Sequence, residues 1–481
     1  MISEETEFSS FFMRTNNRPF FWIRHIAGIC RFSLCLTLLV LGSEPSFGQD
    51  GTVDITFNPG TGVDTEVFCI DIQTNGQILV GGSFTKINGE SRKRIARINL
   101  DGSLDADFLP LEGPDGNVWA VSADQNGSVL IGGEFQAVNT IQRNRFARLR
   151  SDGSLDMSFP SVDFNQVVTS ITKLADGKIL VLGGFNTVNG KARKNVAKLL
   201  SNGSLDLEFN PGSKVVGNIS ATLFLPDGKI IIAGGFTSVD GINRTNIARV
   251  DSMGNIDTTF DAGYIDGAVT KLALQPDGQI LIAGDFKTVN GYSRMRVARL
   301  LPDGTVDAKF VFLGGVDLYV YQIGIDNDSR VYLVGAFSYS YAGTSRRSVV
   351  RLNSDGRVDP SFYPRVNGHV YAYAMQPDRK VIIGGAFQTV NDSSLNGIAR
   401  LNNANSANAE AIFLNVALYP GMFISGAVGS RHRIEFTTNL NLPTQWLPMT
   451  TITLSNVAQQ VFDPQSSSSG TGRFYRSVSL P

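Results

Sequence analysis

Hydrophobic and polar residues follow a pattern of short strands along the chain. Residues 67–74, "VFCIDIQT", alternate as a strand with two different faces does. An "NG" pair, a favoured hairpin turn, separates them from the apolar, glycine-rich segment 77–84, "QILVGGSF". A polar loop at 85–94 precedes a third strand, "IARINL" at 95–100, and a "DG" turn precedes a short fourth, "SLDADF" at 103–108. Four antiparallel strands in about 50 residues predict one blade of a β-propeller.

The same unit occurs seven times in the chain. Its first marker, "ILVGGSF", ends at phenylalanines that are 50 or 51 residues apart, namely Phe84, Phe135, Phe185, Phe236, Phe286, Phe337 and Phe387. Its second marker, "DGSLDADF", ends at Phe57, Phe108, Phe159, Phe209, Phe260, Phe310 and Phe362. Two independent markers that keep one period indicate a repeat architecture. The paired glycines of the first marker predict close approach of neighbouring strands.

The first and last repeats complement each other. Residues 50–57, "DGTVDITF", form a second marker that no repeat precedes, whereas the seventh repeat ends without one. If the chain closes into a ring, residues 50–57 supply the outer strand of the last blade and remove an exposed sheet edge. A linear solenoid would need polar caps instead of this offset. We therefore predict an all-β fold, a seven-bladed β-propeller over residues 49–402 that is closed by its N-terminal strand.

The pattern "DGxILxGGxF…(I/V)AR…DGSLDxxF" resembles the delta-60 repeat family of bacterial β-propellers over about residues 50–402. The resemblance implies an exported or surface-located propeller, and it brings no agreed catalytic residues. The sixth repeat departs from the pattern at 331–347, "VYLVGAFSYSYAGTSRR", which is tyrosine-rich and one residue longer. The seventh lacks the loop arginine and the second "DG".

Residues 1–48 predict a signal peptide. Arginines precede an apolar run at 32–42, which is too short to span a bilayer, and small residues place a cleavage site before Gln49. Initiation at Met1 and at Met13 both stay open, and a buried N-terminal helix is the alternative. We expect export to an extracellular, periplasmic or cell-surface location, with no transmembrane helix in the mature chain.

The charge balance argues against a nucleic-acid binder, and the cysteine content argues against a fold stabilised by disulfides. The chain has 42 Lys and Arg against 43 Asp and Glu, so it lacks the basic excess of a nucleic-acid binder. Of its 3 cysteines, only Cys69 follows the predicted signal peptide, so the mature fold has no internal disulfide and depends on packing. We expect a monomer.

The C-terminal part differs from the repeats. Residues 403–411 are small and polar and predict a linker, and residues 412–481 contain short alternating segments that predict a small β-sandwich-like domain. The pieces "RIEFTTNL", "W" and "RFYR" resemble a C-terminal β-module appended to many secreted bacterial proteins. That resemblance implies sorting or attachment, and a passive end-cap is the alternative.

Six repeats share an arginine at one position of the polar loop, where the seventh has Leu395. These arginines are Arg92, Arg143, Arg193, Arg244, Arg294 and Arg346. A ring of guanidinium groups around a channel mouth would bind carboxylate or sulfate. The alternative is that each pairs with an aspartate such as Asp105 or Asp156. Repetition in every blade favours this structural role, because ligand sites usually break symmetry.

The second residue of each innermost strand does break the symmetry. In chain order these residues are Phe68, Trp119, Thr169, Ser220, Thr270, Tyr321 and Tyr371. The four aromatic ones belong to repeats that are contiguous in a closed ring. We predict an aromatic crescent near the channel entrance, suited to a sugar ring or a protein partner. Packing between blades is the alternative.

Catalytic and metal motifs are absent from the sequence. The "DGSLD" aspartates do not follow calcium-loop spacing, and no H-E-x-x-H, C-x-x-C or G-x-S-x-G occurs. We expect no cofactor. The leading hypothesis is a secreted or cell-surface, non-enzymatic binding or scaffold module for a glycan or protein partner at the loop face. The alternatives are a carbohydrate-active lyase or hydrolase that uses channel carboxylates, and a purely structural surface component.

Overall fold

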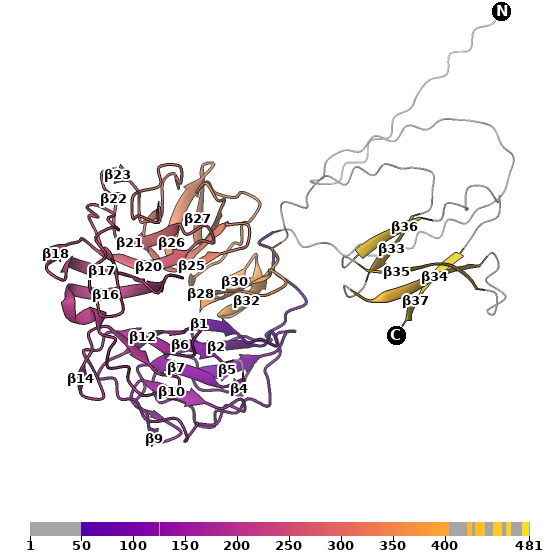
Figure 1. Ribbon diagram of the computed structural model, residues 1–481. Coiled ribbons are helices and arrows are strands. Elements are labelled where there is room, and N and C mark those ends of the chain that lie inside the picture. Colours follow the sequence, from indigo (N-terminus) through magenta and orange to yellow (C-terminus); the bar gives the residue numbers. More distant parts are fainter. Residues whose placement is uncertain are drawn as a thin grey trace, which may run out of the picture. The chain divides into compact units, whose positions relative to one another are not determined.

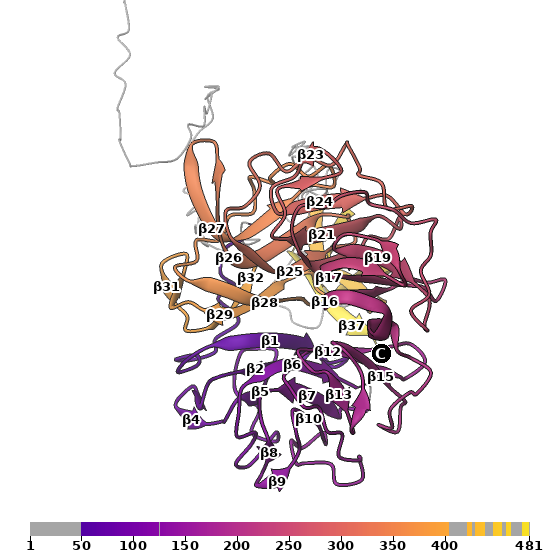
Figure 2. The ribbon, with the colours of Figure 1, turned by 90° about the vertical axis from the view of Figure 1, so that its left-hand side faces the viewer.

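The computed structural model describes residues 50–124, 126–403, 421–425, 429–437, 446–454, 458–462 and 474–480. Within residues 50–403, seven antiparallel sheets follow one another, one for each repeat, and we number these blades in chain order. Each blade has three main strands, and the strand nearest the centre comes first in the sequence (Figures 1 and 2). The prediction of an all-β propeller with seven blade-like repeats is therefore confirmed.

The strand bounds repeat from blade to blade. The inner strands are β1 (Val67–Ile72), β6 (Val118–Ala123), β11 (Val168–Lys173), β16 (Val215–Phe224), β20 (Val269–Leu274), β25 (Tyr319–Ile325) and β28 (His369–Met375). The middle strands are β2 (Ile78–Gly82), β7 (Val129–Gly133), β12 (Ile179–Gly183), β17 (Ile230–Val239), β21 (Ile280–Gly284), β26 (Val331–Tyr341) and β29 (Val381–Ala386). The third strands are β5 (Ile95–Ile98), β10 (Phe146–Leu149), β15 (Val196–Leu199), β19 (Ile247–Val250), β24 (Val297–Leu300), β27 (Thr344–Leu352) and β32 (Ile398–Leu401).

The predicted polar loop contains a small hairpin in most blades. These two-residue strands are β3 (Lys86–Ile87) with β4 (Glu90–Ser91), β8 (Ala137–Val138) with β9 (Ile141–Gln142), β13 (Thr187–Val188) with β14 (Lys191–Ala192), β22 (Thr288–Val289) with β23 (Tyr292–Ser293), and β30 (Thr389–Val390) with β31 (Ser393–Ser394). In blade 4, β18 (Ile242–Asn243) pairs with an extended β17, and a short 3-10 helix, η1 (Pro211–Lys214), precedes β16. In blade 6, β26 and β27 extend to form the hairpin themselves.

The predicted short fourth strand is reduced to a single bridge. In each of the first six blades the fourth segment makes one isolated bridge to the third strand, as Leu104 does with Ile98. Two residues later the chain turns, because the Asp105 carboxylate accepts a hydrogen bond from the Asp107 amide at 2.9 Å. This local turn competes with strand pairing and ends the ladder.

A buried ion pair fixes each fourth segment to its blade. A basic residue on the third strand binds the second aspartate of the "DGSLD" segment at 2.6 to 3.1 Å and lies 4.3 to 5.2 Å from the centre of the following phenylalanine ring. The pairs are Arg97–Asp105, Arg148–Asp156, Lys198–Asp206, Arg249–Asp257, Arg299–Asp307, Arg351–Asp359 and Arg400–Asp54. The arginine also reaches the next blade, as Arg97 Nη1 donates to Ser151 O at 2.7 Å. The motif thus holds blades together as well as strands.

The last of these pairs joins the two ends of the repeat region. Val53 bridges Leu401 of the third strand of blade 7, and the amides of Gly51 and Asp54 donate to the carbonyls of Asn402 and Arg400 at 2.8 Å. Arg400 lies 4.8 Å from the Phe57 ring centre. Residues 50–57 therefore make with blade 7 the contacts that the other fourth segments make with their own third strands.

Paired glycines let the blades approach one another, as the sequence predicted. A Cβ added to Gly81 would lie 2.7 Å from Val118 Cγ1 of blade 2, and one added to Gly132 would lie 2.4 Å from Val168 Cγ1 of blade 3. The same relation holds between Gly384 of blade 7 and Val67 of blade 1, at 2.6 Å. Any side chain at these glycines would push neighbouring blades apart.

Some domain boundaries fall outside the described residues. The predicted signal peptide (1–48) and all of the predicted linker except Asn403 lie there. Asn403 belongs to the propeller, because its side chain accepts a hydrogen bond from Tyr332 and donates one to the Arg379 carbonyl. The boundary at 402 stays a prediction, and Asn403 adds contacts just beyond it.

The described part of the C-terminal region contains two small antiparallel sheets. One pairs β33 (Gly421–Ser425) with β36 (Ala458–Phe462). The other places β34 (Arg431–Thr437) between β35 (Leu447–Thr453) and β37 (Phe474–Leu480). The predicted β structure is present, and its sandwich-like form stays a prediction.

We predict that Asp54→Ala lowers the free energy of unfolding by about 3 kcal/mol at neutral pH, because it leaves the buried Arg400 without its carboxylate. Burial alone would raise the pKa of Asp54, but hydrogen bonds from Lys380 and Thr56 and the Arg400 charge hold it well below its usual value. The contribution of Asp54 is therefore complete above its unfolded pKa of about 3.9 and is lost as the pH falls further. Urea titrations at neutral pH and at about pH 3 measure this dependence.

The matched control is Asp227→Ala. Asp227 is exposed and accepts only a local turn hydrogen bond from the Lys229 amide, so its removal should cost less than about 1 kcal/mol. An Asp54→Ala cost no larger than that of Asp227→Ala would contradict the importance of the pair, as would a difference that grows on acidification.

Candidate functional site

The inner strands surround a cavity of about 970 Å³ at the centre of the propeller. Its lining comes from β1, β6, β11, β20, β25 and β28, together with Glu66 just before β1. Strand β16 contributes no lining residue. Because six different blades supply the wall, residues up to about 300 positions apart in the sequence meet here. We call this space the axial cavity.

A β-bulge gives each inner strand its exposed residue. In β1 the pairing with β2 shifts between Val67 and Cys69, which leaves Phe68 without a cross-strand partner. The same shift occurs at the equivalent position of the other six inner strands. A bulge re-aims the extra side chain, and in five of the seven inner strands that side chain lines the axial cavity.

The four aromatic residues predicted from the sequence do form a contiguous crescent, Trp119–Phe68–Tyr371–Tyr321. Phe68 and Trp119 stack with ring centres 4.0 Å apart and planes at 8°. Tyr371 meets Phe68 edge-on at 5.5 Å and Tyr321 at 5.2 Å. All four are partly exposed and line the axial cavity. The crescent therefore packs blades 6, 7, 1 and 2 together and also presents an aromatic surface.

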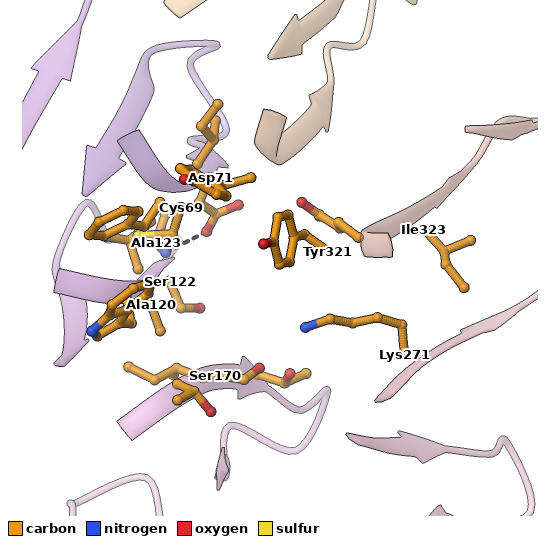
Figure 3. Close-up of a pocket in the computed structure, with 18 of the residues that line it drawn as sticks. Cys69, Asp71, Ala120, Ser122, Ala123, Ser170, Lys271, Tyr321 and Ile323 are labelled. Carbon is orange, nitrogen blue, oxygen red and sulfur yellow. Dashed lines mark hydrogen bonds between the residues drawn. The ribbon is translucent and has the colours of Figure 1, made fainter. Parts of the chain in front are cut away.

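The opposite wall of the axial cavity is polar. Strand β11 supplies Thr169, Ser170 and Thr172, and β20 supplies Lys271, which points into the cavity (Figure 3). Burial lowers the pKa of Lys271. The cavity thus has an aromatic side and a hydroxyl-rich side that carries a cation.

Asp71 of β1 also lines the axial cavity. Its Oδ2 accepts a hydrogen bond from the Ala123 amide of the next blade at 2.7 Å (Figure 3), and its Oδ1 accepts one from the Ile72 amide at 2.9 Å. Burial raises the pKa of Asp71 despite these bonds. Tyr371 also has a raised pKa, about 12, because of burial and the nearby Glu66 charge.

The arginines predicted as a ring at the channel mouth do not line the axial cavity. They are Arg92, Arg143, Arg193, Arg244, Arg294 and Arg346. The first five each donate to the carbonyl of the preceding residue, as Arg143 Nη1 does to Gln142 O at 3.0 Å. Arg346 instead lies 4.0 Å from the centre of the Tyr363 ring.

The predicted pairing of these arginines with Asp105 and Asp156 is also wrong. Those carboxylates form ion pairs with Arg97 and Arg148, which belong to the third strands, and not with the loop arginines. Among the loop arginines, an ion pair joins Arg244 to Asp261 at 3.5 Å. The structural role of the first five loop arginines is therefore carbonyl binding, and Arg294 and Arg346 pack on tyrosine rings.

Lys271 and Asp71 were not predicted as site residues. The sequence prediction rests on the second residue of each inner strand, and Lys271 occupies the next position, directly after the bulge. There the other inner strands carry Cys69, Ala120, Ser170, Ala221, Gln322 and Ala372, so the lysine stands out in the same alignment. The signal for it was present in the sequence.

The described residues contain neither a cluster of metal ligands nor a helix that could span a membrane. Over residues 50–403 and the described C-terminal strands, no three His, Cys, Asp or Glu side chains gather as a metal site. The "DGSLD" aspartates are engaged in turns and ion pairs, as Asp101 is with the Ser103 amide at 2.9 Å. In the same described parts, no helix is long and apolar enough to cross a membrane.

The repeats match one protein family. Its model is described as a domain of unknown function (DUF5122) beta-propeller, and it matches residues 73–108, 125–159, 174–209, 225–260, 275–310, 327–362 and 376–406. These segments cover just over half of the chain. The chain belongs to this family. As a DUF5122 β-propeller it has seven matched repeats. The first six matches each contain the middle strand, the third strand and the ion-paired aspartate segment, and the seventh ends after the third strand.

Solved structures that resemble this DUF5122 β-propeller are distant in sequence. The WD40 β-propeller domain of Doa1 is 12% identical over 74% of this chain and 98% of that chain, with a TM-score of 0.44. The extracellular domain of the putative one component system BT4673 from B. thetaiotaomicron is 13% identical over 74% and 40%, also at 0.44. Virginiamycin B lyase from Staphylococcus aureus is 15% identical over 72% and 98%, at 0.42. No curated protein matches the sequence.

Proposed function

We propose that this protein is an exported propeller, closed into a ring, that binds a glycan in its axial cavity without catalysing a reaction. The aromatic crescent is the observation that carries the proposal. Four partly exposed rings from four blades face a wall of hydroxyl groups inside about 970 Å³, which suits one or two sugar rings. Aromatic faces stack on the apolar faces of sugars, and hydroxyl groups such as those of Thr169 and Ser170 exchange hydrogen bonds with them.

Ring closure is part of this proposal, because the crescent crosses the junction between blades 7 and 1. Tyr371 and Phe68 come from the two sides of that junction. The bridge between Val53 and Leu401 and the Arg400–Asp54 pair support closure. The resemblance to delta-60 repeats, which implies exported or surface-located propellers, supports export in the same way, and the C-terminal β-module suits attachment at the surface.

A carbohydrate-active enzyme is the second candidate, and Asp71 favours it. A buried carboxyl with a raised pKa inside a cavity has the properties of a general acid. Against this role, both oxygens of Asp71 already accept backbone hydrogen bonds, one from Ala123 that joins β1 to β6 and one from the adjacent Ile72. We therefore prefer a structural role for Asp71. Turnover of a bound glycan that Asp71→Asn abolishes would reverse this preference.

Glycan binding should depend on the crescent. We expect the isolated protein to bind members of an oligosaccharide array, and we expect Trp119→Ala and Tyr371→Ala each to weaken that binding by about two- to tenfold, since one stacking contact contributes about 0.5 to 1.5 kcal/mol. Isothermal titration calorimetry with the best array ligand measures the effect.

Tyr264→Ala is the control for this experiment, because Tyr264 is 63% exposed and lies outside the axial cavity. It should leave the affinity unchanged. Two results would argue against a glycan site at the crescent. One is binding of a protein partner without any glycan binding, and the other is an equal loss of glycan affinity in Trp119→Ala, Tyr371→Ala and Tyr264→Ala.

Export makes its own prediction. The protein recovered from outside the cytoplasm should begin at Gln49, since the small residues before it fit a signal-peptidase site. N-terminal sequencing checks this. Recovery of the full-length chain in the cytoplasm would contradict export.

A further inference from the structure

Lys271 distinguishes one inner strand from the other six. It directly follows the bulge of β20, at a position where no other blade carries a charged residue. It lines the axial cavity, and its side chain extends toward the space between Ser122 and Ser170 (Figure 3). The scaffold repeats this position seven times, so packing alone does not require a lysine there.

Lys271 has no counter-ion in the structure. No hydrogen bond or salt bridge joins its ammonium to any residue of the part of the chain that is described. The group is nevertheless largely enclosed by the cavity wall, and its pKa is lowered by that burial. A partly enclosed ammonium without an anion is less stable than a paired one, so the Lys271 charge is available to an anionic partner that comes from outside.

Two other charged groups of the lining already have partners. Lys173 forms an ion pair with Asp124. The Asp71 carboxylate accepts two backbone amides, and the Glu66 charge lies near Tyr371 on the aromatic side. These groups lie along β1, β6 and β11, whereas Lys271 belongs to β20, so its charge is left for a ligand.

We infer that the axial cavity selects acidic glycans, and that Lys271 binds the carboxylate of a uronic-acid unit. This inference rests on the proposed function, because the crescent supplies the stacking surface on which the sugar ring lies. A uronic acid joins the two features that the cavity offers, a ring face to stack and an anionic group to pair. A charge-assisted hydrogen bond in a partly desolvated cavity is about twice as strong as a neutral one, which makes the charge the main determinant of specificity.

Calorimetry with paired ligands tests the inference. The probes are trigalacturonic acid and a hyaluronan tetrasaccharide, each compared with its carboxyl methyl ester. The protein should bind at least one acid about tenfold or more tightly than its ester. Lys271→Met should abolish this preference and leave the affinity for the ester unchanged, whereas Trp119→Ala should weaken both. Lys191→Met, at an exposed lysine of the β13–β14 hairpin, is the matched control and should change neither.

A stability measurement separates a binding role from a structural one. Lys271→Met removes an unpaired enclosed charge while it keeps most of the side-chain volume, so it should raise the midpoint of thermal unfolding. A lysine needed by the fold would instead give a lower midpoint, and that result would overturn the inference.

The outcomes distinguish this inference from the proposed function. Equal affinity for acid and ester, or an acid preference that survives in Lys271→Met, overturns the role of Lys271 and leaves glycan binding standing. Failure of the unmodified protein to bind any acid or ester in the array overturns the proposed function, and the inference with it.

Discussion

A basic side chain on the third strand, held between an aspartate and a phenylalanine ring, is the interaction on which the propeller depends. It compensates for a fourth segment that makes only one bridge to its sheet, and through carbonyls such as Ser151 O it also joins one blade to the next. Breaking one such buried pair costs about 3 kcal/mol, a large fraction of the 5 to 15 kcal/mol that stabilises a typical domain. Arg400 and Asp54 place this interaction between the two ends of the repeat region.

The repeated scaffold and the unique cavity are built from different positions of the same repeat. Glycines, ion pairs and phenylalanines recur in nearly every blade and set the spacing of the sheets. The bulge recurs as well, but the residues at and after it vary, from Trp119 and Tyr371 to Thr169 and Lys271. The equivalent bulges therefore give independently variable groups, and five of the seven bulge residues line one cavity. That separation lets the site change without disturbing the fold.

Sequence periodicity was sufficient to predict the architecture and the crescent. Two markers fixed the repeat, and the order of the aromatic residues predicted which of them meet. The pairing predicted for the loop arginines was wrong because each repeat has two basic positions, one in the loop and one on the third strand. Periodicity does not show which of the two binds the aspartate, and in the first blade it is Arg97 of the third strand. The fourth strand was overestimated because alternation in "SLDADF" does not reveal the aspartate turn. Lys271 was overlooked because only one position of the inner strand was compared across repeats.

Oxidation of an engineered cysteine pair tests most directly whether the ends of the repeat region close the ring. Val53 and Leu401 form a non-hydrogen-bonded antiparallel pair, the arrangement that accepts a cross-strand disulfide, and burial keeps the pKa of the native Cys69 thiol too high for it to compete. Val53→Cys/Leu401→Cys should oxidise as completely as the control Ile98→Cys/Leu104→Cys, which occupies the equivalent bridge within one blade, as judged by mass spectrometry of non-reduced peptides. A disulfide in the control but not across the ends would contradict closure and the cavity that depends on it.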